Sequence, residues 1–279
     1  NFRPHGPEGI SHSLGSVQIP MDAKFIINDG QHRRAAIEKA LEECPELSNE
    51  TISVVLFVDE GLVRSQQLFA DLNRYAVRPT RSLNILYDHR NLTSRLAKEV
   101  SEKVEVFQGM TETAKTTISN RSRKLFTLSG IYQATNKLLD KNKDSDVSDE
   151  ETELAISFWN TVAEQIPHWH QAKSGKVSSY ELRNDFIHAH GIALQAIANC
   201  GSDLLKKNKK GWQKKLLGLQ AIDWRRSSAK IWEGRALTAG RLNKSSNNVA
   251  LTTNLIKKNL GISLNENDQK IETEFLKGK

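Results

Sequence analysis

The residues best suited to chemistry form one short run near the start of the chain: Asp29, Gly30, Gln31, His32, Arg33 and Arg34. The run follows a β-favouring stretch and opens a helical pattern, which predicts a helix amino terminus with free backbone N–H groups. We expect Asp29 to cap this helix and Gly30 to leave room for a ligand. Such a turn could bind a phosphate or a nucleotide, with Asp29 and His32 as candidate catalytic residues. An ordinary capped helix with two exposed arginines is the alternative.

Positive charge is concentrated in a second part of the chain. The formal net charge is +7, but residues 204–244 hold twelve lysines and arginines against two acids, a net of +10. The rest of the chain has 28 basic and 31 acidic residues. Such a patch is typical of a polyanion-binding protein, although a solvated helix face is the alternative. The DNA contacts predicted in this segment are Lys206, Lys207, Lys209, Lys210, Lys214, Lys215, Arg225, Arg226 and Lys230.

A loop predicted at residues 74–81 is a third candidate contact. It places three arginines around one aromatic residue: Arg74, Tyr75, Arg78 and Arg81. The arginines could hold a phosphate backbone while the aromatic ring stacks on a base. Farther along, Trp224 and Trp232 are eight residues apart, which predicts a buried stripe on a helix whose other face is basic.

Histidines and cysteines predict no metal centre. In a helix, the members of the pairs His168/His170 and His188/His190 would face opposite sides; in a loop, His168 and His170 could share a metal, but no cysteine or carboxylate completes a set. The two cysteines are far apart, which suits free thiols in a reducing compartment, with the second one buried. No run of 18 apolar residues exists, so we expect no membrane partner and a cytoplasmic, nucleoid-associated protein.

The elements that must position these residues predict an α+β protein with two domains. In residues 1–106 we expect strands at 17–20, 24–28 and 52–58 and helices at 31–43 and 65–74, which make a small α/β domain. Residues 107–279 should be mainly helical, with Gly261 ending a helix. The helices expected there are 121–140, 151–166, 180–199, 211–219, 227–233, 250–260 and 266–276. The first 15 residues look irregular, and we expect an amino-terminal part of the natural protein to be missing.

Residues 29–33 spell the motif that names the DGQHR domain. Together with residues 19–28, 64–73 and 79–90, they resemble the DndB family, over about residues 17–95. The resemblance implies a fold related to ParB and sulfiredoxin, in which a Gly-x-x-Arg turn contacts nucleotide phosphate. It also implies that family members begin with further strands and a basic segment that this chain lacks.

The resemblance further implies a bacterial regulator encoded with the DNA phosphorothioation enzymes. Such a regulator represses the modification genes by binding double-stranded DNA at their promoter, and it requires no cofactor. A nucleotide-dependent hydrolase or DNA nickase acting at the DGQHR turn, with a nucleoside triphosphate and Mg²⁺, is the alternative. A third hypothesis is an assembly module that docks another DNA-modification protein.

Overall fold

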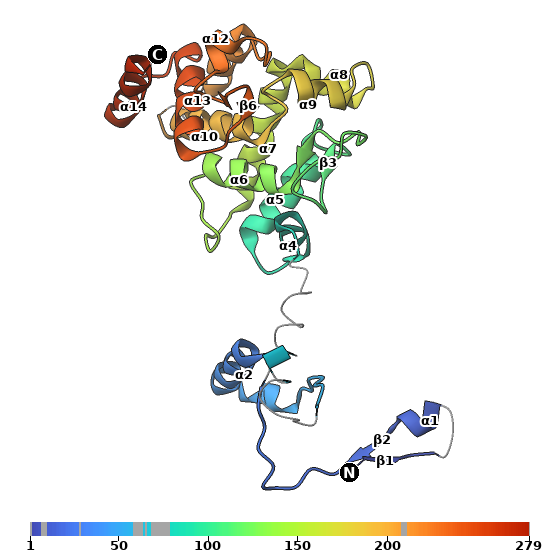
Figure 1. Ribbon diagram of the computed structural model, residues 1–279. Helices are drawn as coiled ribbons and strands as arrows, with labels where there is room; N and C mark the ends of the chain where they lie inside the picture. Colours follow the sequence, from blue (N-terminus) through green and yellow to red (C-terminus); the bar gives the residue numbers. More distant parts are fainter. Residues whose placement is uncertain are drawn as a thin grey trace. The chain divides into compact units, whose positions relative to one another are not determined.

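The computed structural model describes residues 2–6, 10–27, 29–57, 64, 66–67, 79–207 and 211–278. The chain divides into two compact units, Asn1–Arg78 and Pro79–Lys279 (Figure 1). Both α-helices and short β-strands are present, so the predicted α+β class is confirmed, and helices dominate.

The first unit contains few regular elements. Strands β1 (Phe2–Pro4) and β2 (Gly15–Val17) pair in antiparallel fashion around the short helix α1 (Ile10–Ser13). Helix α2 (Gln31–Glu43) follows, and then the 3-10 helix η1 (Pro45–Asn49). The helix predicted at 31–43 is therefore confirmed at both ends, with proline stopping it.

Of the three strands predicted in this unit, the one at 17–20 shares only residue 17 with β2, and the other two are wrong as far as they are described. Residues 24–27 and 51–57 form no strand, and Phe25, Val55 and Phe57 are 66%, 78% and 58% exposed. Helix α2 buries none of its side chains either. A strand needs a neighbour to pair its backbone, and no other described segment of this unit supplies one. Of the helix predicted at 65–74, the structure describes only residues 66 and 67. Both are helical, as is residue 64 just before them.

The second unit is built from helices. It opens with α4 (Arg81–Tyr87) and α5 (Leu92–Lys103), which pack against α6 (Leu128–Leu138) within the unit that begins at Pro79. The other elements are β3 (Thr111–Glu112), β4 (Phe126–Thr127), α7 (Asp149–Gln165), α8 (Pro167–Lys173), α9 (Ser179–Asp185), α10 (Gly191–Lys207), α11 (Trp212–Leu216), η2 (Leu217–Ala221), α12 (Ala229–Trp232), β5 (Leu237–Thr238), β6 (Arg241–Leu242), α13 (Ser246–Asn259) and α14 (Glu266–Lys277).

Helix α10 is the centre of this unit. It packs against α6 on one side and α13 on another, and Gly201 lets it approach α6 and α7 closely. A Cβ atom at Gly201 would lie 2.4 Å from the ring of Phe158 and 2.5 Å from Leu138. All five tryptophans of the chain are buried in this unit.

Two of the predicted helices are wrong in extent. The helix expected at 180–199 is interrupted, because the backbone around Phe186 and Ile187 pairs with Trp224 and Arg225 instead of continuing the α9 spiral. The helix expected at 121–140 begins only at Leu128, since the preceding residues form β4 beside β3. The predicted helices of α7, α13 and α14 are confirmed to within a few residues, and Gly261 ends α13 at a φ of 63°.

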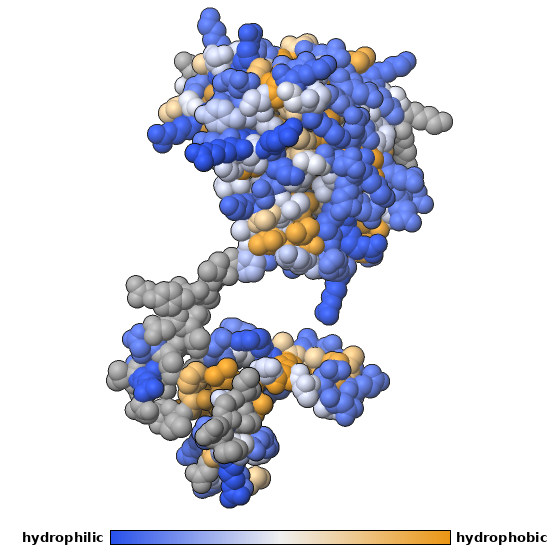
Figure 2. Space-filling view, turned by 90° about the vertical axis from the view of Figure 1, so that its right-hand side faces the viewer, coloured by the Kyte–Doolittle hydropathy of each residue, from blue (hydrophilic) through white to orange (hydrophobic). Residues whose placement is uncertain are grey.

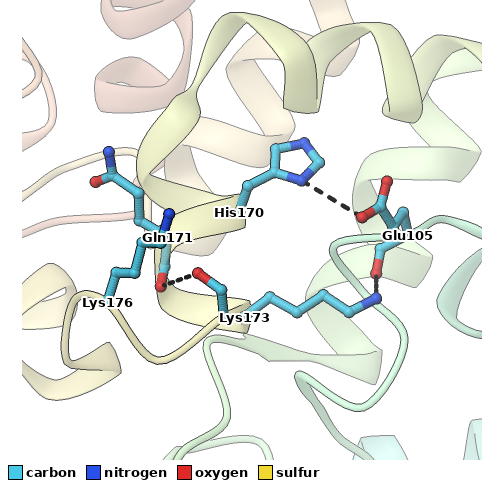
Figure 3. Close-up of a pocket in the computed structure, with 6 residues that line it drawn as sticks. Glu105, His170, Gln171, Lys173 and Lys176 are labelled. Carbon is cyan, nitrogen blue, oxygen red and sulfur yellow. Dashed lines mark hydrogen bonds and ion pairs between the residues drawn. The ribbon is translucent and has the colours of Figure 1, made fainter.

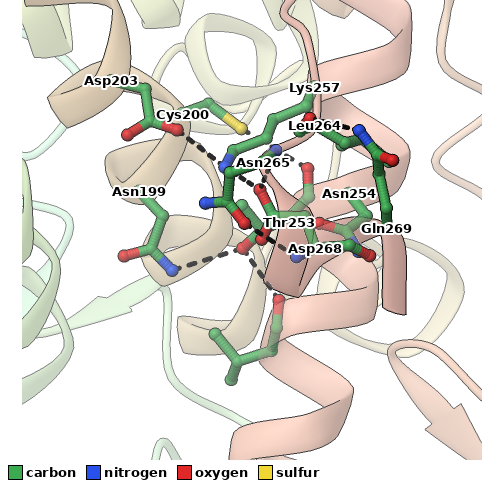
Figure 4. Close-up of polar contacts among 11 residues, drawn as sticks. Asn199, Cys200, Asp203, Thr253, Asn254, Lys257, Leu264, Asn265, Asp268 and Gln269 are labelled. Carbon is green, nitrogen blue, oxygen red and sulfur yellow. Dashed lines mark hydrogen bonds and ion pairs between the residues drawn. The ribbon is translucent and has the colours of Figure 1, made fainter. Parts of the chain in front are cut away.

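Ion pairs attach the last helix. Lys257 on α13 is buried and bridges Asp203 of α10 at 2.6 Å and Asp268 of α14 at 2.7 Å (Figure 4). Arg235 pairs with Glu272 of α14 at 2.5 Å, and both side chains are less than a tenth exposed. Helix α14 is therefore anchored to the unit through charge as well as through apolar contacts.

Candidate nucleic-acid interface

The carboxyl end of α10 and the start of α11 carry the first group of predicted DNA contacts. Lys206 donates a hydrogen bond to Asp140 at 2.7 Å, and this bond lowers the pKa of that carboxyl. Both side chains are more than half exposed, so the pair is open to exchange with another anion. Lys207 is exposed and has no acidic partner among the described residues. Lys209 and Lys210 lie outside the described residues.

Helix α11 is amphipathic. Trp212 and Leu216 are buried, whereas Lys214 and Lys215 are exposed on its other side. Neither lysine forms an ion pair within the described part of the chain. The helix thus presents two free cations on a side that the core leaves open.

Arginines 225 and 226 are engaged with groups of the protein itself. Arg225 holds Asp223 through two hydrogen bonds of 2.9 and 3.1 Å, which lower the pKa of the carboxyl strongly. Arg226 donates to the carbonyls of Asn184 and Gly240, each at 3.1 Å. Asp223 therefore compensates the charge of Arg225, and Arg226 has fewer N–H groups left for an external phosphate than the sequence suggests. Lys230, on α12, is exposed.

The tryptophans beside these arginines belong to the core. Trp224 and Trp232 stack with ring centroids 5.4 Å apart and are buried, as predicted. The single helix expected to align them is not formed, because α12 contains Trp232 but Trp224 lies in the irregular segment before it. Backbone carbonyls of Leu219 and Asp223 accept the two indole N–H groups instead.

The predicted arginine loop is described only at its end. Arg81, in the first turn of α4, lies over the ring of Tyr132 at 5.6 Å and is exposed. Arg74, Tyr75 and Arg78 lie outside the described residues.

The DGQHR turn differs from expectation in its cap. Gly30, at a φ of 106°, takes the N-cap position of α2, and no side chain caps the helix. Asp29 therefore does not cap; it accepts a hydrogen bond from Arg33 at 2.6 Å. Arg34 pairs with Glu38 at 2.7 Å in the same way. Because glycine holds the cap position, the first backbone N–H groups of α2 lack a side-chain partner.

The other side chains of the turn make only local contacts. Gln31 donates to the carbonyl of Ile27 at 3.3 Å, and His32 is exposed. Within the described residues, no group from a distant segment joins Asp29 and His32.

Among the histidines of the second unit, His188 is a core residue. His188 is fully buried, accepts a hydrogen bond from the Trp169 indole at 3.1 Å and has its pKa lowered to about 3 by burial. Burial likewise lowers the pKa of His190 to about 4. His168 and His170 lie on α8, and no group of three possible metal ligands occurs in the described ranges.

One basic region was missed at the sequence level. Arg183 of α9 is buried and holds the loop at residues 119–124, which carries further exposed arginines. The available signal was the absence of acids from residues 113–124, which contain four basic residues.

Fold and site thus define a mostly helical α+β protein with concentrated basic surfaces. Among its described residues, no helix is long and apolar enough to cross a membrane. The family model for DndB, described as DNA-sulfur modification-associated, matches residues 1–263, and the chain belongs to this family. Membership implies a role in the DNA sulfur-modification system. No curated protein and no solved structure matches the chain.

Proposed function

We propose that this protein binds double-stranded DNA at the promoter of the DNA phosphorothioation genes and represses their transcription. Family membership supports the link to DNA sulfur modification. The observation that carries the proposal is the group of exposed lysines around α11, Lys207, Lys214 and Lys215, which have no acidic partner among the described residues. Free cations of this kind neutralise phosphates and release counterions from DNA.

The first experiment measures binding to the promoter of the protein's own operon and to a random duplex across a salt series. We expect tighter binding to the promoter and an affinity that falls steeply as salt rises. Absent binding, or binding insensitive to salt, would contradict the proposal.

A triple variant, K207Q/K214Q/K215Q, tests the lysines themselves. Each phosphate that a lysine no longer neutralises should reduce the slope of log affinity against log salt by about 0.9, for promoter and random duplex alike. The matched control is K137Q/K270Q/K277Q, which removes three exposed lysines from α6 and α14. Equal slopes in the two variants would remove the α11 lysines from the interface.

A second candidate function rests on the uncapped start of α2. Gly30 adopts a left-handed backbone conformation at the N-cap, and the uncapped N–H groups that follow it could bind a phosphate group. The alternative is therefore a nucleotide-dependent hydrolase or DNA nickase that uses a nucleoside triphosphate and Mg²⁺. The expected relation to the ParB and sulfiredoxin fold, in which a Gly-x-x-Arg turn contacts nucleotide phosphate, is part of this second proposal. Titration with ATP or CTP tests it: Gly30→Ala and Arg33→Ala should abolish binding, while Lys39→Ala, farther along α2, should not. Full retention by both variants would reject it.

A further inference from the structure

A buried arginine that pairs with no carboxylate in the described part of the chain fixes one loop of the second unit. Arg183 donates to the carbonyls of Ser119, Asn120 and Ser122 at 3.0 to 3.3 Å, and also to the carbonyl of Lys124. The hydroxyl of Ser179 donates to the carbonyl of Arg123 at 2.8 Å. Helix α9 thus satisfies the inward carbonyls of this loop and holds its backbone in one conformation.

The side chains of the held loop are exposed and positive. Residues 113–124 contain Lys115, Arg121, Arg123 and Lys124 and no acid. Lys115, Arg121 and Arg123 are exposed, and no acidic side chain pairs with them in the described part of the chain. The loop therefore projects uncompensated charge from a rigid base.

A second acid-free segment adjoins this loop. Residues 167–178 contain Lys173 and Lys176 and no acid. A terminal guanidinium nitrogen of Arg123 lies 4.0 Å from where a Cβ of Gly175 would be, so the two segments meet there. Figure 1 places β3 next to α8 and α9, and Figure 2, which faces this side, shows it to be mostly hydrophilic.

The second segment lines an open hollow of 470 Å³ (Figure 3). Its lining residues are Glu105, His170, Gln171, Lys173, Ser174 and Lys176. Lys173 reaches across and donates to the backbone carbonyl of Glu105. The Glu105 carboxylate, 3.7 Å from His170, is the one acidic group of this lining. Lys176 remains exposed, with no ion pair among the described residues.

We propose that Arg121, Arg123 and Lys176, here called the α8–α9 basic surface, form a second contact for the phosphate backbone of double-stranded DNA. The inference rests on the proposed DNA-binding function and adds a surface outside residues 204–244. The planar guanidinium groups of arginine can donate two parallel hydrogen bonds to phosphate oxygens. Because Arg183 already fixes the loop, the loop loses little conformational entropy on binding. These three cations are spread over two segments and do not converge in one enclosed pocket. Such an arrangement fits successive phosphates of a DNA backbone better than a single small anion.

Salt-dependent binding to a random duplex tests this surface with the full chain. We expect R121Q/R123Q/K176Q to bind about 10- to 100-fold more weakly at ~0.1 M salt, with the salt slope reduced by about 0.9 for each phosphate that is no longer neutralised. The control is again K137Q/K270Q/K277Q, which should bind nearly as wild type. Glu105→Gln should act in the opposite direction and tighten binding, because it removes the acid from the hollow.

The outcomes separate the two proposals. If the wild-type chain binds no DNA, the proposed function fails and this surface fails with it. If the wild type binds and the triple variant matches its control, the α8–α9 basic surface is rejected while the α11 lysines can still account for binding. Arg183→Lys keeps the charge but removes most of the carbonyl bonds, so it should weaken binding without changing the salt slope. Should that variant not fold, the triple variant still decides the question.

Discussion

Replacing Glu272 by glutamine should destabilise the second unit at neutral pH and flatten its acid response. The Glu272 side chain is 6% exposed and accepts hydrogen bonds from Arg235 at 2.5 and 3.0 Å and from Lys258 at 2.6 Å. Glutamine would leave the buried Arg235 cation without a counter-charge. Breaking one side of a buried pair costs about 3–5 kcal/mol.

The pH dependence follows from the pKa of Glu272. Burial raises this pKa, but the hydrogen bonds from Arg235 and Lys258 lower it further, to about 2 from an ordinary 4.5. The difference corresponds to about 3 kcal/mol of folding free energy. Because the folded pKa is depressed, this stabilisation is present above pH ~4.5 and is lost as the pH falls toward ~2.

Urea unfolding followed by tryptophan fluorescence measures the effect, since every tryptophan lies in the second unit. We expect E272Q to be about 3–5 kcal/mol less stable than wild type at pH 7, and the difference to shrink by about 3 kcal/mol on lowering the pH to ~2. Glu274→Gln, an exposed position on the same helix, is the control and should behave as wild type. A constant difference between E272Q and wild type from pH 7 to pH 2 would refute the reasoning.

Three further predictions use the buried groups of the second unit. Gly201→Ala should lower stability by about 1–3 kcal/mol, because the new methyl group would overlap Phe158; an unchanged melting temperature would show that the ring can move aside. A thiol reagent should titrate one cysteine in the native protein, the exposed Cys44, and two in denaturant, because burial shields Cys200 and raises its pKa; two fast thiols in the native state would contradict this burial. Proton NMR should find His188 neutral down to about pH 3, and titration near pH 6.5 would show that its site admits water.

Elements with a strong local signal could be predicted from the sequence. Helix α2 has a glycine before it and a proline after it, and α7 carries a capping box between Ser148 and Glu151. The strands expected at 24–28 and 52–58 rested on β-propensity alone. That propensity describes how a side chain packs on a sheet, and no described neighbour supplies the sheet.

The candidate interface was predictable in charge but not in geometry. A count of lysines and arginines could not separate Arg225, which pairs with Asp223, from Lys214, which has no acidic partner among the described residues. Arg121 and Lys176 are far apart in sequence, and only the bonds of Arg183 and the approach of Arg123 to Gly175 bring their segments together. Pairing and long-range contact depend on the fold, so composition does not reveal them.

The length of helix α10 can be compared with the length of a DNA duplex. At its amino end, the ring of His190 bonds to the Arg183 carbonyl at 2.7 Å, next to the loop that Arg183 holds, and its carboxyl end is Lys207. Seventeen residues at 1.5 Å each make a rod of about 25 Å. At about 3.4 Å per base pair, that length equals roughly seven base pairs. A duplex that contacts groups beside both ends of α10 therefore needs at least about that length.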